Sequence, residues 1–224
     1  MQKAIFFGAI GTLVETSDLQ RRAFNQSFIE MGLDWYWDTA TYADLLTRSG
    51  GARRVADFAA NLGEQVDADT VHARKVAIFD EMLRREGLRL REGVRDVIDT
   101  VHNRGLALGF VSSTSEEQIE AIFAALGNEL DSAAFNFIAD KSMVSRVKPD
   151  PEIYEIALDQ LGIAKDEVIA IEDSPESAEA ALRAGLMTYV TPGALHVRHD
   201  FPAEAVILST LSTDILEQQR IAAE

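Results

Sequence analysis

The second half of the chain alternates short apolar runs with amphipathic stretches, and this alternation constrains the fold more than any other feature. Helical periodicity separates apolar runs that predict buried strands at residues 106–111, 135–139, 168–171 and 187–190. A similar run at residues 3–7 predicts a first strand. Strands that alternate with helices of ten or more residues form a parallel, doubly wound sheet with right-handed crossovers. We therefore expect an α/β fold that binds ligands beyond the carboxyl ends of its strands.

The residues between 17 and about 87 interrupt this alternation, because they carry helical periodicity and no convincing strand. An apolar stripe of Leu19, Ala23, Phe24, Phe28 and Met31 predicts the first helix of this part. Three further helices are predicted at residues 39–47, 53–62 and 69–85. We interpret this part as a helical bundle inserted after the first strand. The domain prediction is a core of residues 1–15 and 90–224 with a helical cap of residues 16–89.

The composition argues against several classes of partner. The formal net charge is −16, from 37 acidic and 21 basic residues, which argues against nucleic acid or an anionic membrane as the main partner. The chain has no cysteine, so it has neither disulfides nor a thiolate nucleophile, and we expect a cytoplasmic location. The apolar stretch after Lys3 is too short and too interrupted for a signal peptide or membrane span. A protein partner stays open, as does the choice between a monomer and a small homo-oligomer.

Four short segments with chemically active side chains lie at the ends of predicted strands. They are FFGAIGTL at residues 6–13, VSST at 111–114, VKPDP at 147–151 and IEDSP at 171–175. The carboxyl ends of parallel strands meet at one edge of a sheet, so we expect these segments to converge on one site.

The residue types in these segments suit a phosphoryl group. Phosphoryl transfer needs a nucleophile, neutralisation of negative charge and a bridging metal. Lys148 offers a cation on a loop stiffened by prolines, and Ser112 offers a hydroxyl beside a helix N-terminus, which favours anions. Glu172 and Asp173 offer the hard oxygen ligands that Mg²⁺ prefers. The simpler alternatives are a solvated loop lysine, a helix-capping serine and a helix-capping acidic pair.

Together and in this order, the segments resemble the haloacid dehalogenase-like superfamily over essentially the whole chain. The inserted bundle resembles the helical cap of the branch that contains β-phosphoglucomutase, phosphoglycolate phosphatase and related sugar-phosphate phosphatases. Residues 19–25 and 50–54 particularly resemble phosphatases that act on phosphorylated pentuloses in carbon-fixing bacteria. The resemblance implies a Rossmannoid core, catalytic roles for Ser112 and Lys148, and a phosphorylated small molecule as ligand.

The resemblance also implies which residues contact the substrate. Ser113 and Thr114 would bind it from the core, and Gly51, Arg53 and Arg54 would bind it from a substrate-facing loop of the cap at residues 50–54. Arginine suits phosphate because its planar fork donates two parallel hydrogen bonds. Lys75 is a possible helper, although we expect it to face solvent.

Two positions depart from the family pattern, in which the first strand ends in Asp-x-Asp. Gly8 stands where the nucleophile is expected and Ile10 where the general acid/base is expected. Glycine can neither attack phosphorus nor ligate a metal, and isoleucine has no proton to give. Losing such a pair typically costs roughly 10⁴ to 10⁶ in kcat. Mg²⁺ remains a possible cofactor, held by Asp173, Glu172 and the backbone carbonyl of Ile10, but weakened by the loss at Gly8.

No other side chain is identified as a replacement nucleophile. Glu15 is expected to point toward the cap hinge; His72 and His102 fall in predicted helices, and His196 and His199 follow the last strand. Three functions therefore stay open. The first is a catalytically impaired homologue that binds a phosphorylated small molecule or a partner, and the second is an active phosphatase or phosphomutase with a non-standard mechanism. The third is an interaction protein with a vestigial cleft and a candidate contact patch at Trp35-Tyr36-Trp37, although such aromatic residues more often pack into the core of the cap itself.

Overall fold

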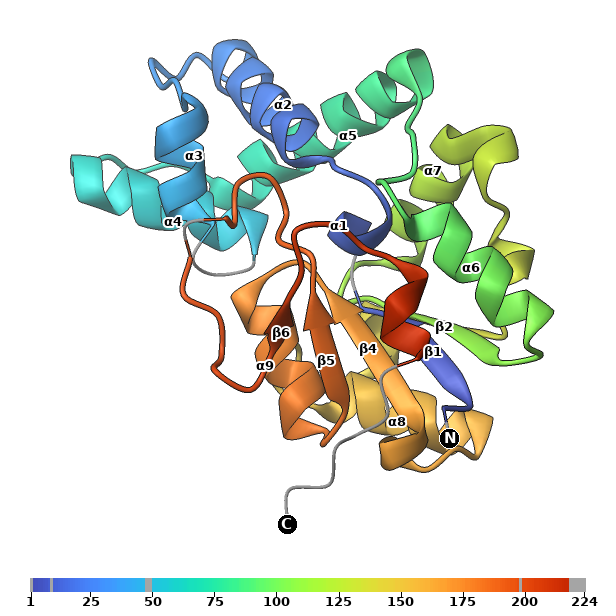
Figure 1. Cartoon of the computed structure of the whole chain (residues 1–224). Coiled ribbons are helices and arrows are strands. Elements are labelled where there is room, and N and C mark those ends of the chain that lie inside the picture. The colour runs from blue at the N-terminus through green and yellow to red at the C-terminus, as the bar shows by residue number, and fades with distance from the viewer. Residues whose placement is uncertain (1, 9, 47–49, 198, 218–224) are drawn as a thin grey trace.

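A parallel sheet of six strands, in the order β3-β2-β1-β4-β5-β6, organises the protein (Figure 1). The computed structural model describes residues 2–8, 10–46, 50–197 and 199–217. All neighbouring strands pair in parallel, which confirms the predicted doubly wound α/β fold. The strands are β1 (Ala4–Phe7), β2 (Ala107–Val111), β3 (Phe137–Ala139), β4 (Val168–Glu172), β5 (Met187–Val190) and β6 (Val206–Ile207).

Helices cover the sheet and build a bundle beyond the carboxyl ends of the strands (Figure 1). Among the described residues, no helix is long and apolar enough to cross a membrane. The α-helices are α1 (Ile10–Leu13), α2 (Ser17–Glu30), α3 (Thr39–Leu45), α4 (Gly51–Leu62), α5 (Ala68–Glu86), α6 (Val94–Asn103), α7 (Glu116–Leu126), α8 (Glu152–Leu161) and α9 (Pro175–Arg183). Single turns of 3-10 helix lie at Gly127–Glu129, Ser132–Ala134, Lys141–Met143, Lys165–Glu167 and Thr213–Leu216.

Three local predictions differ from the structure. The strand expected at residues 135–139 is two residues too long, because the Phe135 amide donates to the Ser132 carbonyl and closes a turn there. The glycine-rich turn after β1 contains a short helix, α1. Strand β6 has no counterpart in the prediction, since both of its residues are exposed at the edge of the sheet and leave no buried apolar run.

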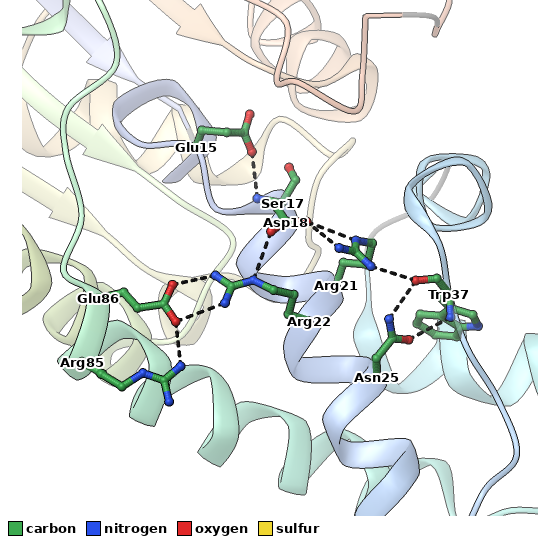
Figure 2. A network of polar contacts seen from close by, with 9 residues as sticks. All are labelled: Glu15, Ser17, Asp18, Arg21, Arg22, Asn25, Trp37, Arg85 and Glu86. Carbon is green, nitrogen blue, oxygen red and sulfur yellow. Dashed lines mark hydrogen bonds and ion pairs between the residues drawn. The ribbon is translucent and has the colours of Figure 1, made fainter.

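The bundle has an aromatic core of its own. Its buried members are Phe24, Phe28, Trp35, Trp37, Tyr42, Val55, Ala59 and Val71. The patch expected at Trp35-Tyr36-Trp37 is therefore wrong for both tryptophans, which are 6% and 0% exposed, whereas Tyr36 is 71% exposed. Asn25 fixes the backbone of Trp37, since its side chain donates to the Trp37 carbonyl and accepts from the Trp37 amide, both at 2.8 Å (Figure 2). Trp35 packs against Phe28 and Phe58.

The two connections between the sheet and the bundle lie side by side. Val14 and Leu90 form an antiparallel bridge, immediately before α2 and after α5. Arg22 on α2 donates two hydrogen bonds to Glu86 at the end of α5, and Asp18 binds both Arg21 and Arg22 (Figure 2). The proposed division at residues 15–16 and 89–90 stays a prediction, with this bridge as its structural counterpart.

Candidate functional site

The sheet order brings the four sequence segments together. Strands β2, β1 and β4 are neighbours, and the register pairs Phe7 at the end of β1 with Phe110 and with Ile171. Gly8, Ser112 and Asp173 therefore follow adjacent strand ends. The Gly8 amide donates to the Ile171 carbonyl at 2.9 Å, which continues the ladder into the site.

Lys148 is the centre of a buried polar network at this edge. Its ammonium donates to Glu172 Oε1 at 2.9 Å, to the Tyr154 hydroxyl at 3.1 Å and to the Gly8 carbonyl. The Tyr154 hydroxyl donates in turn to Glu172 Oε1. Lys148 is 4% exposed, and Glu172 and Tyr154 are fully buried. Lys148 is therefore not a solvated loop lysine, the simpler alternative from the sequence. The negative charge of Glu172 stabilises its ammonium group inside the fold.

This network occupies the space beside Gly8. A Cβ atom on Gly8 would overlap both the Tyr154 hydroxyl and the Glu172 carboxylate. Any larger side chain at this position therefore requires the ends of these two side chains to move. Lys148 and Glu172 neutralise each other's charge without a carboxylate from the end of β1.

The two carboxyl groups at the end of β4 have perturbed acidities. Burial raises the pKa of Glu172, against the opposing effects of Lys148 and Tyr154. Burial and the neighbouring Glu172 raise the pKa of Asp173 to about 7, and Arg91 and Lys148 oppose this shift. Asp173 is thus the carboxyl group of the site that exchanges a proton near neutral pH, which suits it to acid–base work.

The donor set for Mg²⁺ is reduced. Asp173 Oδ2 lies against Gly11, where a Cβ would overlap it, and the Ile10 carbonyl accepts the Val14 amide at 3.0 Å in α1. Glu172 commits Oε1 to Lys148 and Tyr154, and its Oε2 is buried with no hydrogen-bond partner in the described part of the chain. Within the described ranges, no three histidine, aspartate or glutamate side chains converge as a metal site. Without a carboxylate from the end of β1, these groups are a poorer Mg²⁺ site than the one that the resemblance implies.

The hydroxyl segment after β2 lines the same edge. Ser112 is 3% exposed, and its Oγ accepts the Thr114 amide at 3.2 Å. Ser112 is not the helix cap, since Ser115 caps α7 by accepting the Gln118 amide. Ser113 Oγ is buried and has no hydrogen-bond partner among the described residues. This segment therefore retains hydroxyl capacity that a bound anion could use.

The cap contributes its cations from helices rather than from a loop. Gly51, Arg53 and Arg54 form the first turn of α4, which corrects the loop expected at residues 50–54; residues 47–49 lie outside the described part. Gly51 lies against the His72 ring, where a Cβ would overlap it. Arg54 is 9% exposed, donates from Nε to the Leu45 carbonyl at 2.8 Å and lies over the Tyr42 ring.

Lys75 is buried, which contradicts the expectation that it faces solvent. Its ammonium lies 4.9 Å and 4.8 Å from the ring centroids of Phe24 and Phe79 and donates to Gln20. The long stem packs along these rings, so burial is compatible with an amphipathic side chain. Burial lowers the pKa of Lys75 to about 7, and the nearby Arg54 adds to the effect.

A groove of about 530 Å³ separates the start of α4 from the loops at the strand ends. Arg53 borders it from the cap, and Pro149 and Pro175 border it from the core. The remaining lining residues are Glu176, Glu179, Asp200, Phe201 and Pro202. The groove therefore lies beside the loop that carries Lys148 and the start of α9.

Sequence reasoning missed three contributors to the site. Tyr154 follows the VKPDP segment by three residues, and this spacing places its hydroxyl on Lys148. Arg91 binds the Gly11, Thr191 and Pro192 carbonyls and so fixes the turn after β1, but nothing in its local sequence marks it. Glu15 was expected to point toward the hinge, and its Oε1 accepts the Ser17 amide there (Figure 2). Its Oε2 also accepts the Ala194 amide from the loop after β5, a contact that the sequence did not indicate.

The site is thus a buried lysine–carboxylate network beside hydroxyl groups, at the strand ends of a doubly wound α/β sheet. The family model for haloacid dehalogenase-like hydrolases matches residues 2–185, and the chain belongs to this family. The protein CbbY of Cereibacter sphaeroides is 37% identical over 204 residues, which cover 89% of this chain and 88% of that protein.

Solved structures agree with this assignment. The crystal structure of CbbY from Rhodobacter sphaeroides in complex with phosphate superposes with a TM-score of 0.82 at 34% identity, covering 94% of this chain and 95% of that one. A mutant of the same protein in complex with xylulose-1,5-bisphosphate gives the same TM-score, identity and coverage. The fold and the membership of the haloacid dehalogenase-like hydrolases are therefore established, and the activity of this chain is a separate question.

Proposed function

We propose that the protein binds a phosphorylated sugar, a pentulose bisphosphate by its likeness to CbbY, and hydrolyses it poorly or not at all. The observation that carries this proposal is the end of β1. There the backbone of Gly8 meets Lys148, and the space of the missing carboxylate contains the Tyr154 hydroxyl and Glu172. Binding groups are retained while the attacking group is absent.

The retained groups support two separated anion-binding ends. Ser112, Ser113, Thr114 and Lys148 lie at the strand ends, and Arg54 with Lys75 lies in the cap. Lys148 is already paired with Glu172, so the hydroxyl and amide groups after β2 would carry much of the phosphate contact in the core. Charged hydrogen bonds from the cap would hold the second phosphate.

A second candidate is a slow phosphatase that lets water attack the phosphate directly. The observation that favours it is the pKa of Asp173, raised to about 7, since a carboxyl group of that acidity can take or give a proton at neutral pH. Mg²⁺ could assist only through Asp173 and water, so we infer that its binding is weak. The third function, an interaction protein, is not supported by the candidate contact patch, because Trp35 and Trp37 are buried.

The experiment combines a binding and a turnover measurement. Isothermal titration with xylulose-1,5-bisphosphate is expected to show binding to the wild type, while its phosphatase rate with a panel of sugar phosphates and Mg²⁺ stays near background. A Gly8→Asp/Ile10→Asp variant is expected to gain activity over the wild type. Turnover by the wild type at ordinary phosphatase rates would refute the proposal, as would the absence of any bound sugar phosphate.

A further inference from the structure

The segment from Gly193 to Val197, which we call the strap, joins the core to the cap. It follows β5 and rises toward α4 as the orange trace in Figure 1. The Gly193 amide donates to the Asp173 carbonyl at 2.9 Å, and the Ala194 amide donates to Glu15 Oε2 at 2.7 Å. Leu195 packs against the aromatic core of the bundle. The start of the strap is therefore held by the Asp173 backbone carbonyl and the Glu15 carboxylate, and its middle packs on the cap.

His196 is the polar side chain that the strap brings to the carboxylates. A methyl group on Gly193 would contact three side chains at once: the His196 ring at 3.2 Å, Asp173 Oδ2 at 3.6 Å and Glu15 Oε2 at 3.7 Å. These groups come from three separate segments and surround one point at the strand ends. Among the described residues they do not form a metal site.

Among the described residues, the hydrogen bonds of His196 engage one ring nitrogen, Nδ1, and not Nε2. Its Nδ1 lies 3.1 Å from His199 Nδ1, and its backbone amide donates to the Gly193 carbonyl. Burial and His199 lower the pKa of His196 to about 4, so the ring is neutral at pH 7. Nε2 of a neutral imidazole can form a hydrogen bond with a ligand but adds no positive charge. It therefore favours a hydroxyl group of the ligand over a phosphate dianion.

We propose that His196 contacts the hydroxylated carbon chain of the ligand, between the phosphate held by the core and the phosphate held by Arg54. This inference rests on the proposed function, since it names a further residue of the same site. The strap then forms a third wall of the cleft, beside the strand ends and the cap. His196 selects for a polyol chain between the phosphates rather than for the phosphates themselves.

Two probes separate this role from a general loss of binding. Titration of inorganic phosphate and of xylulose-1,5-bisphosphate is compared for the wild type, His196→Ala and His196→Gln. Loss of one hydrogen bond between neutral groups predicts an increase of about 3- to 10-fold in the Kd of the bisphosphate for His196→Ala. The Kd of inorganic phosphate is expected to stay within about twofold. His196→Gln keeps a hydrogen-bonding group and is expected to recover part of the loss.

Control variants and thermal melting keep the outcomes distinct. His102→Ala removes an exposed histidine on α6 and is expected to leave both constants unchanged. If the wild type binds the bisphosphate and both His196 variants match it, or if they weaken both probes equally, this inference is overturned and the proposed function stands. If the wild type binds neither probe, both fall. Melting temperatures of the variants near that of the wild type show that a changed Kd reports on contact rather than on folding.

Discussion

Replacing Lys148 with methionine tests whether the network around Gly8 is a compensated charge pair. The substitution keeps most of the side-chain volume and removes the ammonium that lies 2.9 Å from Glu172 Oε1. Glu172 is fully buried, so its carboxylate would then lack both water and a counter-ion. Breaking a buried pair by removing one partner costs about 3–5 kcal/mol of the free energy of unfolding.

In a protein of this size, each kcal/mol shifts the melting temperature by about 2–4 °C, so the expected decrease is roughly 6–20 °C. Urea unfolding followed by circular dichroism at pH 8 and pH 5 measures the same loss as a free energy. Burial already raises the pKa of Glu172, and losing Lys148 raises it further. A raised carboxyl pKa favours the folded state at low pH, so the deficit of Lys148→Met is expected to be smaller at pH 5 than at pH 8.

Two further variants make this prediction sharp. Lys148→Met/Glu172→Gln leaves no buried charge and is expected to recover most of the loss, which a simple cavity or packing defect would not do. Lys141→Met removes an exposed lysine and is expected to change stability by less than about 0.5 kcal/mol. A deficit for Lys148→Met below about 1 kcal/mol, or a double variant as unstable as the single one, would refute the reasoning.

Three other outcomes follow from the site. Adding Tyr154→Phe to the Gly8→Asp/Ile10→Asp variant is expected to raise kcat on an aryl phosphate by about tenfold. The reason is that it removes the hydroxyl group that overlaps the new carboxylate. An unchanged kcat would mean that the Tyr154 hydroxyl does not hinder the carboxylate. Asp173 has a folded-state pKa of about 7, above its unfolded value, so its contribution to stability is present at low pH and is lost as pH rises from about 4 to 7. Asp173→Asn is therefore expected to have a higher free energy of unfolding than the wild type at pH 8, by up to about 4 kcal/mol. Urea titrations with chelator are expected to show that this difference disappears near pH 4. The same dependence of stability on pH in both proteins would contradict the shifted pKa. Arg54→Ala is expected to weaken xylulose-1,5-bisphosphate about 10- to 100-fold in calorimetry, with inorganic phosphate little affected, and equal losses for both ligands would place its effect elsewhere.

The sequence predicted the sheet well because buried parallel strands are apolar on both faces. Strand β5 matches its predicted bounds, and β2 and β4 differ from theirs by one residue. The edge strand β6 carries no such signal, since its two residues are exposed. Helix α1 was hidden for a different reason: its four residues are too few for a helical period to appear.

The sequence could predict which residues meet at the site where the order of strands brings them together. It could not predict those that meet through side-chain packing. Strand ends in a parallel sheet must meet, so Gly8, Ser112 and Asp173 could be grouped from the sequence. The burial of Lys75 could not, because it depends on Phe24 and Phe79 from two different helices. The strap was missed for the same reason, since its hydrogen bond from Ala194 to Glu15 joins positions 179 residues apart in the numbering.

The most direct test of the central claim is a phosphorus NMR spectrum of the wild-type protein with an equimolar amount of xylulose-1,5-bisphosphate and Mg²⁺, followed over hours. This one measurement reports binding through the phosphate resonances and hydrolysis through the appearance of inorganic phosphate. The account predicts shifted or broadened bisphosphate resonances that persist, with little inorganic phosphate. Rapid conversion to inorganic phosphate would contradict the loss of catalysis, and unchanged resonances would contradict the retained binding site.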